Sequence, residues 1–372
     1  MLAEMKWQMD RRGVLAGSAA LAVSGCTTAD ASRPGTAPPA RPACLPRVQV
    51  DPARVIRTVA GLRPFRPSGF VVRAEKLGEA LLVHNYGHGG GGISLSWGSS
   101  RLATALGLPG HSGPVAVIGA GIMGLTTARL VQEAGYPVTI YTETLPPGTT
   151  SNIAGGQIYP ASHFDPDSVT PQWREQAAAA ADYSRRRFQI MAGDDYGIRW
   201  LPTFDQTRRT GALPPDPIFP GRTRLPSSEH PFPLENVVRY DTMYAETGRF
   251  LERLLRDIRI AGGSVQVRRF ATPADVASLP ERLVFNCTGL GAAALFGDSE
   301  LIPVRGQLAV LIPQPEVQYA YSLSAGYMFP RGDGILLGGT FERGEYLAEP
   351  QPADIAAIVE SHRSLMTGWR CA

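Results

Sequence analysis

A glycine-rich turn near the middle of the chain has the spacing of a phosphate-binding loop. Gly119-Ala-Gly-Ile-Met-Gly124 follows the apolar run 115–118 and precedes a stretch whose spacing predicts a helix. Gly119 allows a sharp strand-to-helix turn, Gly121 lets the backbone approach a pyrophosphate, and Gly124 lets the helix pack close to the strand. Free N–H groups at the start of such a helix attract phosphate. The predicted binding residues are Gly119, Gly121, Ile122, Met123 and Gly124.

An acidic residue follows the next predicted strand. Residues 137–141 form that strand, and Glu143 comes just after it. A carboxylate at this place accepts hydrogen bonds from adenosine ribose hydroxyls and disfavours a 2′-phosphate. The strand, turn, helix, strand and acid together predict a site for FAD or NAD rather than NADP, and this motif does not separate the first two.

An arginine in a proline-containing segment is a candidate for binding a carboxylate. Arg63 lies within Gly61-Leu-Arg-Pro-Phe-Arg-Pro67, which predicts a rigid turn that Pro64 stiffens. A guanidinium holds a carboxylate through two parallel hydrogen bonds and stays charged. We expect Arg66, in the same segment, to be structural.

A run of histidines and glycines, His84-Asn-Tyr-Gly-His-Gly-Gly-Gly-Gly92, follows a predicted strand at 80–84. Two histidines fall short of the three or four ligands of a zinc site, so no metal is predicted. Glycines let backbone pass close to a planar ring, and N–H groups at a helix start stabilise negative charge. The residues predicted to contact such a ring and its negative charge are Gly89, Gly90, Gly91, Gly92, Ile93 and Ser94.

The first 26 residues predict an export signal. Arg11-Arg12 precede the apolar run 14–23, which is too short to span a bilayer, and paired arginines are typical of twin-arginine export. The ending Val23-Ser-Gly-Cys26 resembles a bacterial lipobox, whose cysteine, here Cys26, would be lipidated. We therefore expect a bacterial periplasmic protein or a lipoprotein anchored to the membrane, with residues 27–46 as a Pro- and Ala-rich linker.

The composition is that of a globular protein. Hydrophobic residues make up 44% and charged residues 19% of the chain, so it is neither disordered nor embedded in a membrane. The net charge of +3 and the lack of a basic run with interleaved aromatics argue against nucleic acid. Strands that alternate with helices predict an α/β fold.

The segments around Arg63, His84 and Gly119 resemble those of the D-amino-acid oxidase (DAO) family. Further matching segments are Leu95-Ser-Trp-Gly98, Asn286-Cys-Thr-Gly289, Arg305-Gly-Gln307, Gly326-Tyr-Met-Phe-Pro-Arg-Gly-Asp-Gly334 and Gly338-Gly-Thr-Phe341. The resemblance implies a Rossmann-type FAD-binding domain interlaced with an α+β substrate domain that carries a mixed or antiparallel sheet. It also implies oxidative deamination of a D-amino acid: hydride passes from Cα to flavin N5, giving a 2-oxo acid and ammonia, and O2 is reduced to hydrogen peroxide.

The resemblance also implies residue roles. Tyr327 joins Arg63 in holding the substrate carboxylate, and Gly90 lies beside the reacting atoms. The family often has a tyrosine over the site as a lid, and here that position is Leu323. Tyr319 and Tyr321 lie nearby in the sequence, so the residue that forms the lid is left undecided. The remaining cofactor-binding residues implied are Thr149, Thr150, Ser151 and Thr288.

The order of these segments departs from the family. The Arg-Pro and His-Asn-Tyr-Gly segments, which close the chain in the family, here precede the dinucleotide fold, so a circular permutation is predicted. The predicted segments are 1–26 (export signal), 27–46 (linker), 47–110 (permuted segment with the arginine turn, glycine loop and helix), 111–165 (dinucleotide-binding βαβ and phosphate loop), 166–246 (substrate domain), 247–300 (return to the FAD domain) and 301–372 (substrate-domain sheet and final helix).

Two cysteines flank the predicted permutation break. Cys44 precedes the displaced segment and Cys371 follows the last predicted helix, so an exported protein could join them in a disulfide; two free thiols are the alternative. Cys287 is expected to be a small buried residue.

Other functions remain open from the sequence. They are a glycine or amine oxidase of the same fold, a dehydrogenase that passes electrons to a carrier, and a flavin-binding protein without catalysis. The choice of D-amino acid and the oligomeric state are also open.

Overall fold

A computed structural model describes residues 44–208, 211–213, 216, 218–219 and 221–371. The predicted export signal, Cys26 and most of the linker 27–46 lie outside the described residues. No helix in the described ranges is long and apolar enough to cross a membrane.

One of the two sheets has six strands in the order β2-β3-β10-β4-β5-β9. All neighbours are parallel except β2 and β3. Strands β10 and β4 are buried along their whole length, as expected when helices cover both faces of a parallel sheet. The strands are β2 (Val71–Leu77), β3 (Ala80–Tyr86), β4 (Val115–Ile118), β5 (Val138–Thr142), β9 (Ser264–Val267) and β10 (Leu283–Asn286).

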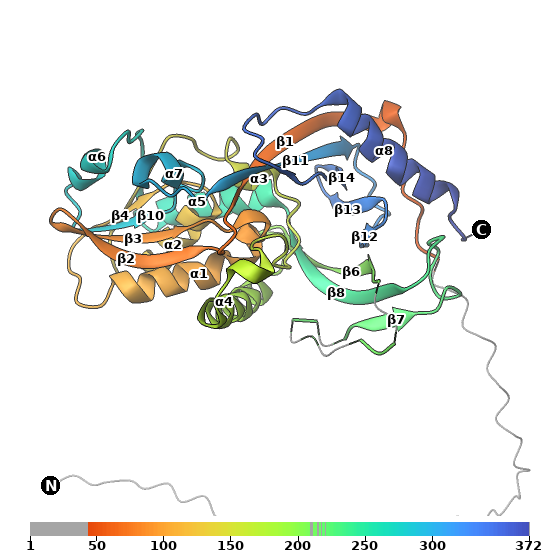
Figure 1. Cartoon of the computed structure of the whole chain (residues 1–372), viewed down its shortest axis with the longest axis horizontal. Helices are drawn as coiled ribbons and strands as arrows, with labels where there is room; N and C mark the ends of the chain where they lie inside the picture. Colours follow the sequence, from red (N-terminus) through yellow and green to blue (C-terminus); the bar gives the residue numbers. More distant parts are fainter. Residues whose placement is uncertain (1–43, 209–210, 214–215, 217, 220, 372) are drawn as a thin grey trace, which may run out of the picture. The chain divides into compact units, whose positions relative to one another are not determined.

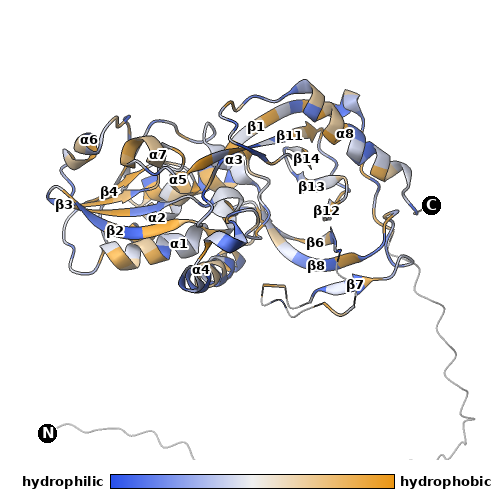
Figure 2. Ribbon diagram, viewed as in Figure 1, coloured by the Kyte–Doolittle hydropathy of each residue, from blue (hydrophilic) through white to orange (hydrophobic). Residues whose placement is uncertain are grey.

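Helices cover both faces of this sheet (Figure 1). One apolar cluster joins Val117, Ile140 and Phe285 to α1, α2 and α5, and another joins Ala116 and Val284 to the region of α6 and α7. Figure 2 shows orange, apolar stretches within this sheet and blue, hydrophilic stretches along its edge strand β2. The helices are α1 (Gly92–Gly107), α2 (Ile122–Glu133), α4 (Pro171–Ile190), α5 (Thr247–Ile260), α6 (Pro273–Ala277) and α7 (Gly291–Phe296).

The second sheet has nine strands, in the order β1-β11-β14-β13-β12-β6-β8-β7, with β15 also paired to β11. Only the β12–β6 pair is parallel. The strands are β1 (Val55–Phe65), β6 (Ile198–Gln206), β7 (Thr223–Leu225), β8 (Val237–Ala245), β11 (Ile302–Leu311), β12 (Ala320–Leu323), β13 (Gly326–Arg331), β14 (Gly334–Gly338) and β15 (Glu342–Arg343). A mixed sheet next to a Rossmann-type sheet agrees with the predicted fold class.

The two faces of this sheet have different roles. Helix α8 (Pro352–Thr367) packs on one face, where Ile355 and Val359 meet Tyr321 and Met328. Phe329 follows Met328 along β13, so its side chain lies on the other face of the sheet. There it belongs to a separate apolar cluster together with Leu308 of β11. Both residues also line the cavity described below.

Residues 48–110 contribute to both sheets. They provide β1 at the edge of the large sheet, β2 and β3 in the parallel sheet, and α1. The prediction of a turn over 61–67 was wrong for most of that range, because β1 continues to Phe65 and pairs Arg63 with Val304 of β11. Pro64 is tolerated because β1 is an edge strand, where a missing N–H leaves no inner neighbour unpaired.

The start and the end of the described chain lie together, near the label C in Figure 1. Cys44 and Cys371 form a disulfide with their Cα atoms 5.6 Å apart. Packing also holds this region, since Val48 is buried and the Tyr319 hydroxyl donates to the carbonyl of Pro46 over 2.8 Å. Cys287 is buried with a free thiol.

Candidate active site

A cavity of about 900 Å³ is lined by residues from both sheets. It brings together residues that are far apart in the chain, including Arg63, Gly121, Glu143 and Tyr327. The other predicted site residues on its wall are Gly89, Gly90, Gly92, Ile93, Gly119, Ile122, Met123, Thr149, Thr150, Ser151 and Thr288. Gly91, Ser94 and Gly124 do not line it: Gly91 packs on His163, the Ser94 hydroxyl donates to the carbonyl of Gln157, and Gly124 lies under the turn.

The glycine turn between β4 and α2 is required by packing. Gly119 has φ +109°, and a Cβ there would lie 2.5 Å from the carbonyl oxygen of Cys287. A Cβ on Gly124 would lie 1.8 Å from the carbonyl oxygen of Gly119. The N-cap residue Gly121 has no side chain to cap α2, and among the first N–H groups of the helix that of Ile122 donates to Ser151 Oγ over 3.0 Å. The turn therefore presents backbone donors to the cavity, as a pyrophosphate requires.

Charged groups also line the cavity where β5 and β9 end. The Glu143 carboxylate is mostly exposed and lies 3.7 Å from Arg269. Arg268 and Phe270 line the same part of the cavity. The Glu143 carboxylate can accept hydrogen bonds from ribose hydroxyls. Arg268 and Arg269 supply positive charge, and the Phe270 ring supplies a flat apolar surface.

The glycine loop before α1 packs against protein backbone. Gly89 has φ +50°, and a Cβ on Gly89 or Gly90 would lie 2.8 Å from the carbonyl oxygen of Ser162 or Ala161. The Gly90 N–H donates to Ser162 over 2.9 Å. Close approach of residues 161–163, rather than a ring alone, therefore explains why this loop needs glycine.

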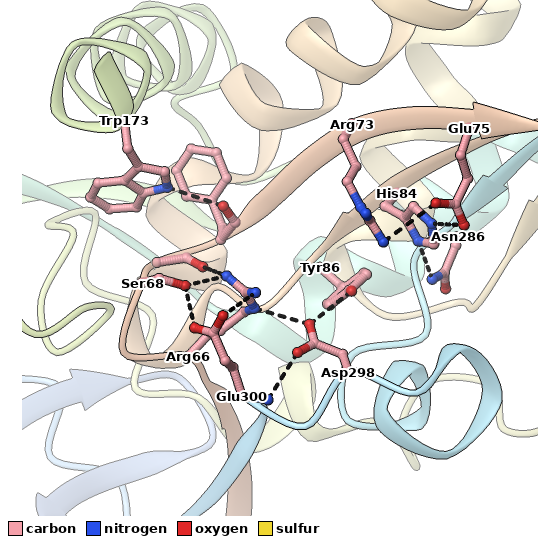
Figure 3. A network of polar contacts seen from close by, with 12 residues as sticks. Arg66, Ser68, Arg73, Glu75, His84, Tyr86, Trp173, Asn286, Asp298 and Glu300 are labelled. Atoms are coloured by element: carbon pink, nitrogen blue, oxygen red, sulfur yellow. Dashed lines mark hydrogen bonds and ion pairs between the residues drawn. The ribbon is translucent and has the colours of Figure 1, made fainter. Parts of the chain in front are cut away.

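Both histidines of the loop are buried. His84 contacts the Glu75 carboxylate through Nε2 at 3.0 Å and the Asn286 amide through Nδ1 at 2.9 Å (Figure 3). His88 stacks on Phe70 at 4.8 Å, and burial lowers its pKa to about 3. Within the described residues, no group of three or more His, Cys, Asp or Glu side chains could hold a metal.

Arg66 joins the N-terminal segment to the loop after α7. Its Nε donates to Asp298 and its Nη2 to Glu300, both over 2.9 Å, and the Tyr86 hydroxyl also donates to Asp298 (Figure 3). This partly buried network gives Arg66 a structural role, as expected from the sequence.

Arg63 and Tyr327 lie beside one another on the cavity wall. Arg63 Nη1 donates to the carbonyls of Thr340 and Arg305 over 3.1 and 3.3 Å, which fixes the guanidinium. Tyr327 stacks on Phe329 with centroids 4.7 Å apart. Burial raises the pKa of Tyr327, although the neighbouring Arg63 opposes this, so the hydroxyl keeps its proton and can donate it in a hydrogen bond.

The residues discussed for the lid face away from the cavity. The Tyr321 hydroxyl contacts His362 Nδ1 at 2.7 Å, and Tyr321, Tyr319 and Leu323 belong to the cluster under α8. Six further residues line this cavity and were not singled out individually from the sequence. They are Gln157, Tyr159, Asp205, Ser322, Phe329 and Phe341. Strand alternation in Ala320–Leu323 was a usable signal for Ser322, the one polar position between apolar ones with its side chain on the opposite face.

These residues fit an extended dinucleotide with a flavin. The cavity is within the size range of cofactor sites, and it is lined by Glu143, the glycine turn 119–123 and Arg63. Helices α1 and α2 both start at its wall without a side-chain cap. Glu143, the turn 119–123 and residues 149–151 would hold the ADP part, and the loop 89–92 the flavin end.

Comparisons with known proteins agree with this arrangement. Residues 114–369 match the family described as DAO, FAD dependent oxidoreductase. A D-amino-acid oxidase from Streptomyces coelicolor is 31% identical over 274 residues, covering 67% of this chain and 76% of that protein. A D-amino acid oxidase from Dugesia ryukyuensis is 26% identical over 274 residues, covering 68% and 78%. An iminodiacetate oxidase from Chelativorans sp. BNC1 has a similar fold, with a TM-score of 0.51, 16% identity, and coverage of 68% of this chain and 79% of that one. The chain therefore belongs to the DAO family of FAD-dependent oxidoreductases, and FAD is its cofactor.

Proposed function

We propose that this oxidoreductase deaminates D-amino acids with O2 as the electron acceptor. The observation that carries the proposal is the pairing of the Arg63 guanidinium with the Tyr327 hydroxyl in the cavity that also holds the glycine turn. A fixed guanidinium and a protonated phenol form a binding site for one carboxylate. The names of the two similar proteins support the same substrate class.

The protein residues act mainly by positioning. Arg63 binds the substrate carboxylate in two hydrogen bonds, and Tyr327 donates a third. Phe329 and Phe341 provide apolar walls that exclude water. Glu143, the turn 119–123 and the loop 89–92 would hold FAD, which would supply the acceptor for the hydride lost from Cα. The substrate would leave as an imino acid that hydrolyses to the 2-oxo acid and ammonia, and O2 would be the final oxidant, giving hydrogen peroxide.

An anaerobic titration tests this proposal. Purified holoenzyme is mixed with panels of D- and L-amino acids, and loss of the flavin absorbance near its long-wavelength maximum is followed. We expect reduction by D-amino acids alone, and peroxide after air is admitted. Reduction without peroxide would favour a dehydrogenase, reduction by glycine or by amines alone a related oxidase, and no reduction by any of them a flavin-binding protein without catalysis.

We also propose that residues 47–110 are circularly permuted relative to the family. The family match begins after this segment, at residue 114, although β3 pairs with β10 and β1 with β11 inside the shared fold. The adjacent Cys44 and Cys371 make a new connection between the ends feasible. A rearranged chain with residues 47–110 placed after residue 371 should fold and bind flavin; loss of flavin with an unfolded spectrum would contradict the proposal.

We further propose that the protein is exported and lipidated. The support is the Arg11-Arg12 pair, the apolar run after it and the Ser-Gly-Cys26 ending. Fractionation of cells with the natural signal, with both arginines replaced by lysine, and with Cys26→Ala tests this. Loss of export in the lysine variant and loss of membrane association in Cys26→Ala are the expected results.

A further inference from the structure

Asp205 is a charged cavity residue that the proposed reaction does not use. It lies near the end of β6 and lines the cavity with Arg63 and Tyr327. Its Oδ2 accepts a hydrogen bond from the Tyr240 hydroxyl over 2.7 Å. Its Oδ1 is buried and has no hydrogen-bond partner among the described residues. A buried carboxylate oxygen without a partner is costly, so its presence at a ligand cavity calls for an explanation.

Asp205 has no ion-pair partner within the described ranges. The Arg222 guanidinium acts on it through its charge, but forms its own ion pair with Asp216 at 3.2 Å. Burial accordingly raises the pKa of Asp205 to about 6, which leaves it ionised near neutral pH. A cationic ligand group would supply both the charge and the hydrogen bond that Oδ1 lacks.

The sheet register places Asp205 in one row with the substrate tyrosine. Ser322 of β12 lies directly opposite Asp205 of β6 and directly opposite Tyr327 of β13. Residues opposite one another point to the same face, and Figure 1 shows these strands side by side. Two strand spacings separate Asp205 from Tyr327, about 9.5 Å at ~4.8 Å each. Ser322, between them, is exposed toward the cavity.

Building on the proposed oxidation of D-amino acids, we propose that Asp205 binds the positively charged end of the substrate side chain. The preferred substrates are then basic D-amino acids: lysine, ornithine or arginine. Five bonds of about 1.5 Å carry a lysine chain roughly 6 Å from Cα to Nζ. When Arg63 and Tyr327 hold the substrate carboxylate, a side chain of this length reaches along the row to Asp205. A short side chain does not reach it and leaves the Asp205 carboxylate unpaired.

The test compares two substrates that differ in charge and by only the terminal atom in length. Steady-state kcat/KM is measured for D-lysine and for D-norleucine, which has an apolar chain, with wild-type holoenzyme, Asp205→Asn and Asp241→Asn. Asparagine keeps an oxygen for the Tyr240 hydrogen bond. Asp241 is the matched control, since it is an exposed carboxylate on the neighbouring strand β8, paired with Arg239.

We expect the wild type and Asp241→Asn to prefer D-lysine, and the D-lysine to D-norleucine ratio to fall about ten- to a hundredfold in Asp205→Asn. A wild type that prefers D-norleucine, or an Asp205→Asn that loses both substrates equally, would overturn the assignment while D-amino-acid oxidation stands. The second result would place the carboxylate on the substrate amino group instead. If no D-amino acid reduces the flavin, the proposed function itself fails, and this inference with it.

Discussion

Replacing Asp205 with asparagine should stabilise the protein at neutral pH, although it removes a predicted substrate contact. Burial raises the pKa of Asp205 from 3.8 to about 6. An unfolded chain therefore releases this proton at lower pH than the folded one, and the free energy of unfolding falls as pH rises from about 4 to about 6. Two pKa units correspond to at most about 3 kcal/mol. Asparagine carries no charge, so the free energy of unfolding of the variant does not fall over this pH range through residue 205.

The assay is urea unfolding of the holoenzyme at pH 5 and pH 8, followed by tryptophan fluorescence. The charged and titratable side chains that influence Asp205 come from several segments and are unchanged in the variant: Tyr159, Arg222, Tyr240 and Tyr244. We expect Asp205→Asn to gain stability over the wild type at pH 8 and to gain only about half as much at pH 5, with Asp241→Asn showing no such difference. Equal differences at both pH values would refute a buried, ionised Asp205.

Three further predictions follow from the other contacts. Arg63→Ala should raise KM for D-amino acids by at least a hundredfold while flavin stays bound. Arg63→Lys should recover only part of the loss, because lysine cannot bind a carboxylate through two parallel hydrogen bonds. An unchanged KM in steady-state assays would show that the substrate carboxylate binds elsewhere. The double variant Cys44→Ser, Cys371→Ser should lower the free energy of unfolding by up to ~6 kcal/mol, because the disulfide closes a loop of 327 residues. Urea unfolding with and without reductant measures this loss, and reductant should destabilise the wild type as the double variant does. Cys287→Ala is the control, because it keeps the disulfide and should remain sensitive to reductant. Gly124→Ala should weaken flavin retention on gel filtration, because its Cβ would lie 1.8 Å from a backbone oxygen; full retention would contradict the tight turn.

The local motifs could be predicted because each one carries its own geometry. The turn 119–124 needs only neighbouring residues to bend the chain and start α2, so its place was evident from spacing. Arg63 and Tyr327 were identified from short segments, and the structure brings them to one cavity. What the sequence could not supply was the backbone of β1, where pairing with β11 turns an expected proline turn into a strand.

Asp205 shows why the substrate end escaped prediction. No motif surrounds it, and its importance comes from the pairing of β6 with β12, which are separated by more than a hundred residues. The same holds for Gln157 and Tyr159, whose cavity positions depend on the pairing of residues 156–158 with the end of β8. Long-range register of this kind leaves no local pattern in a single sequence.

The bond between Cys44 and Cys371 turns nearly all of the described chain into a covalent ring. An ATP-driven unfoldase that grips the residues before Cys44 and pulls would meet two polypeptide strands at once when it reaches the bond. A linear domain of the same fold would instead be threaded as one strand. Degradation by such a machine would thus have to wait for reduction of the bond or for an endoproteolytic cut within the ring.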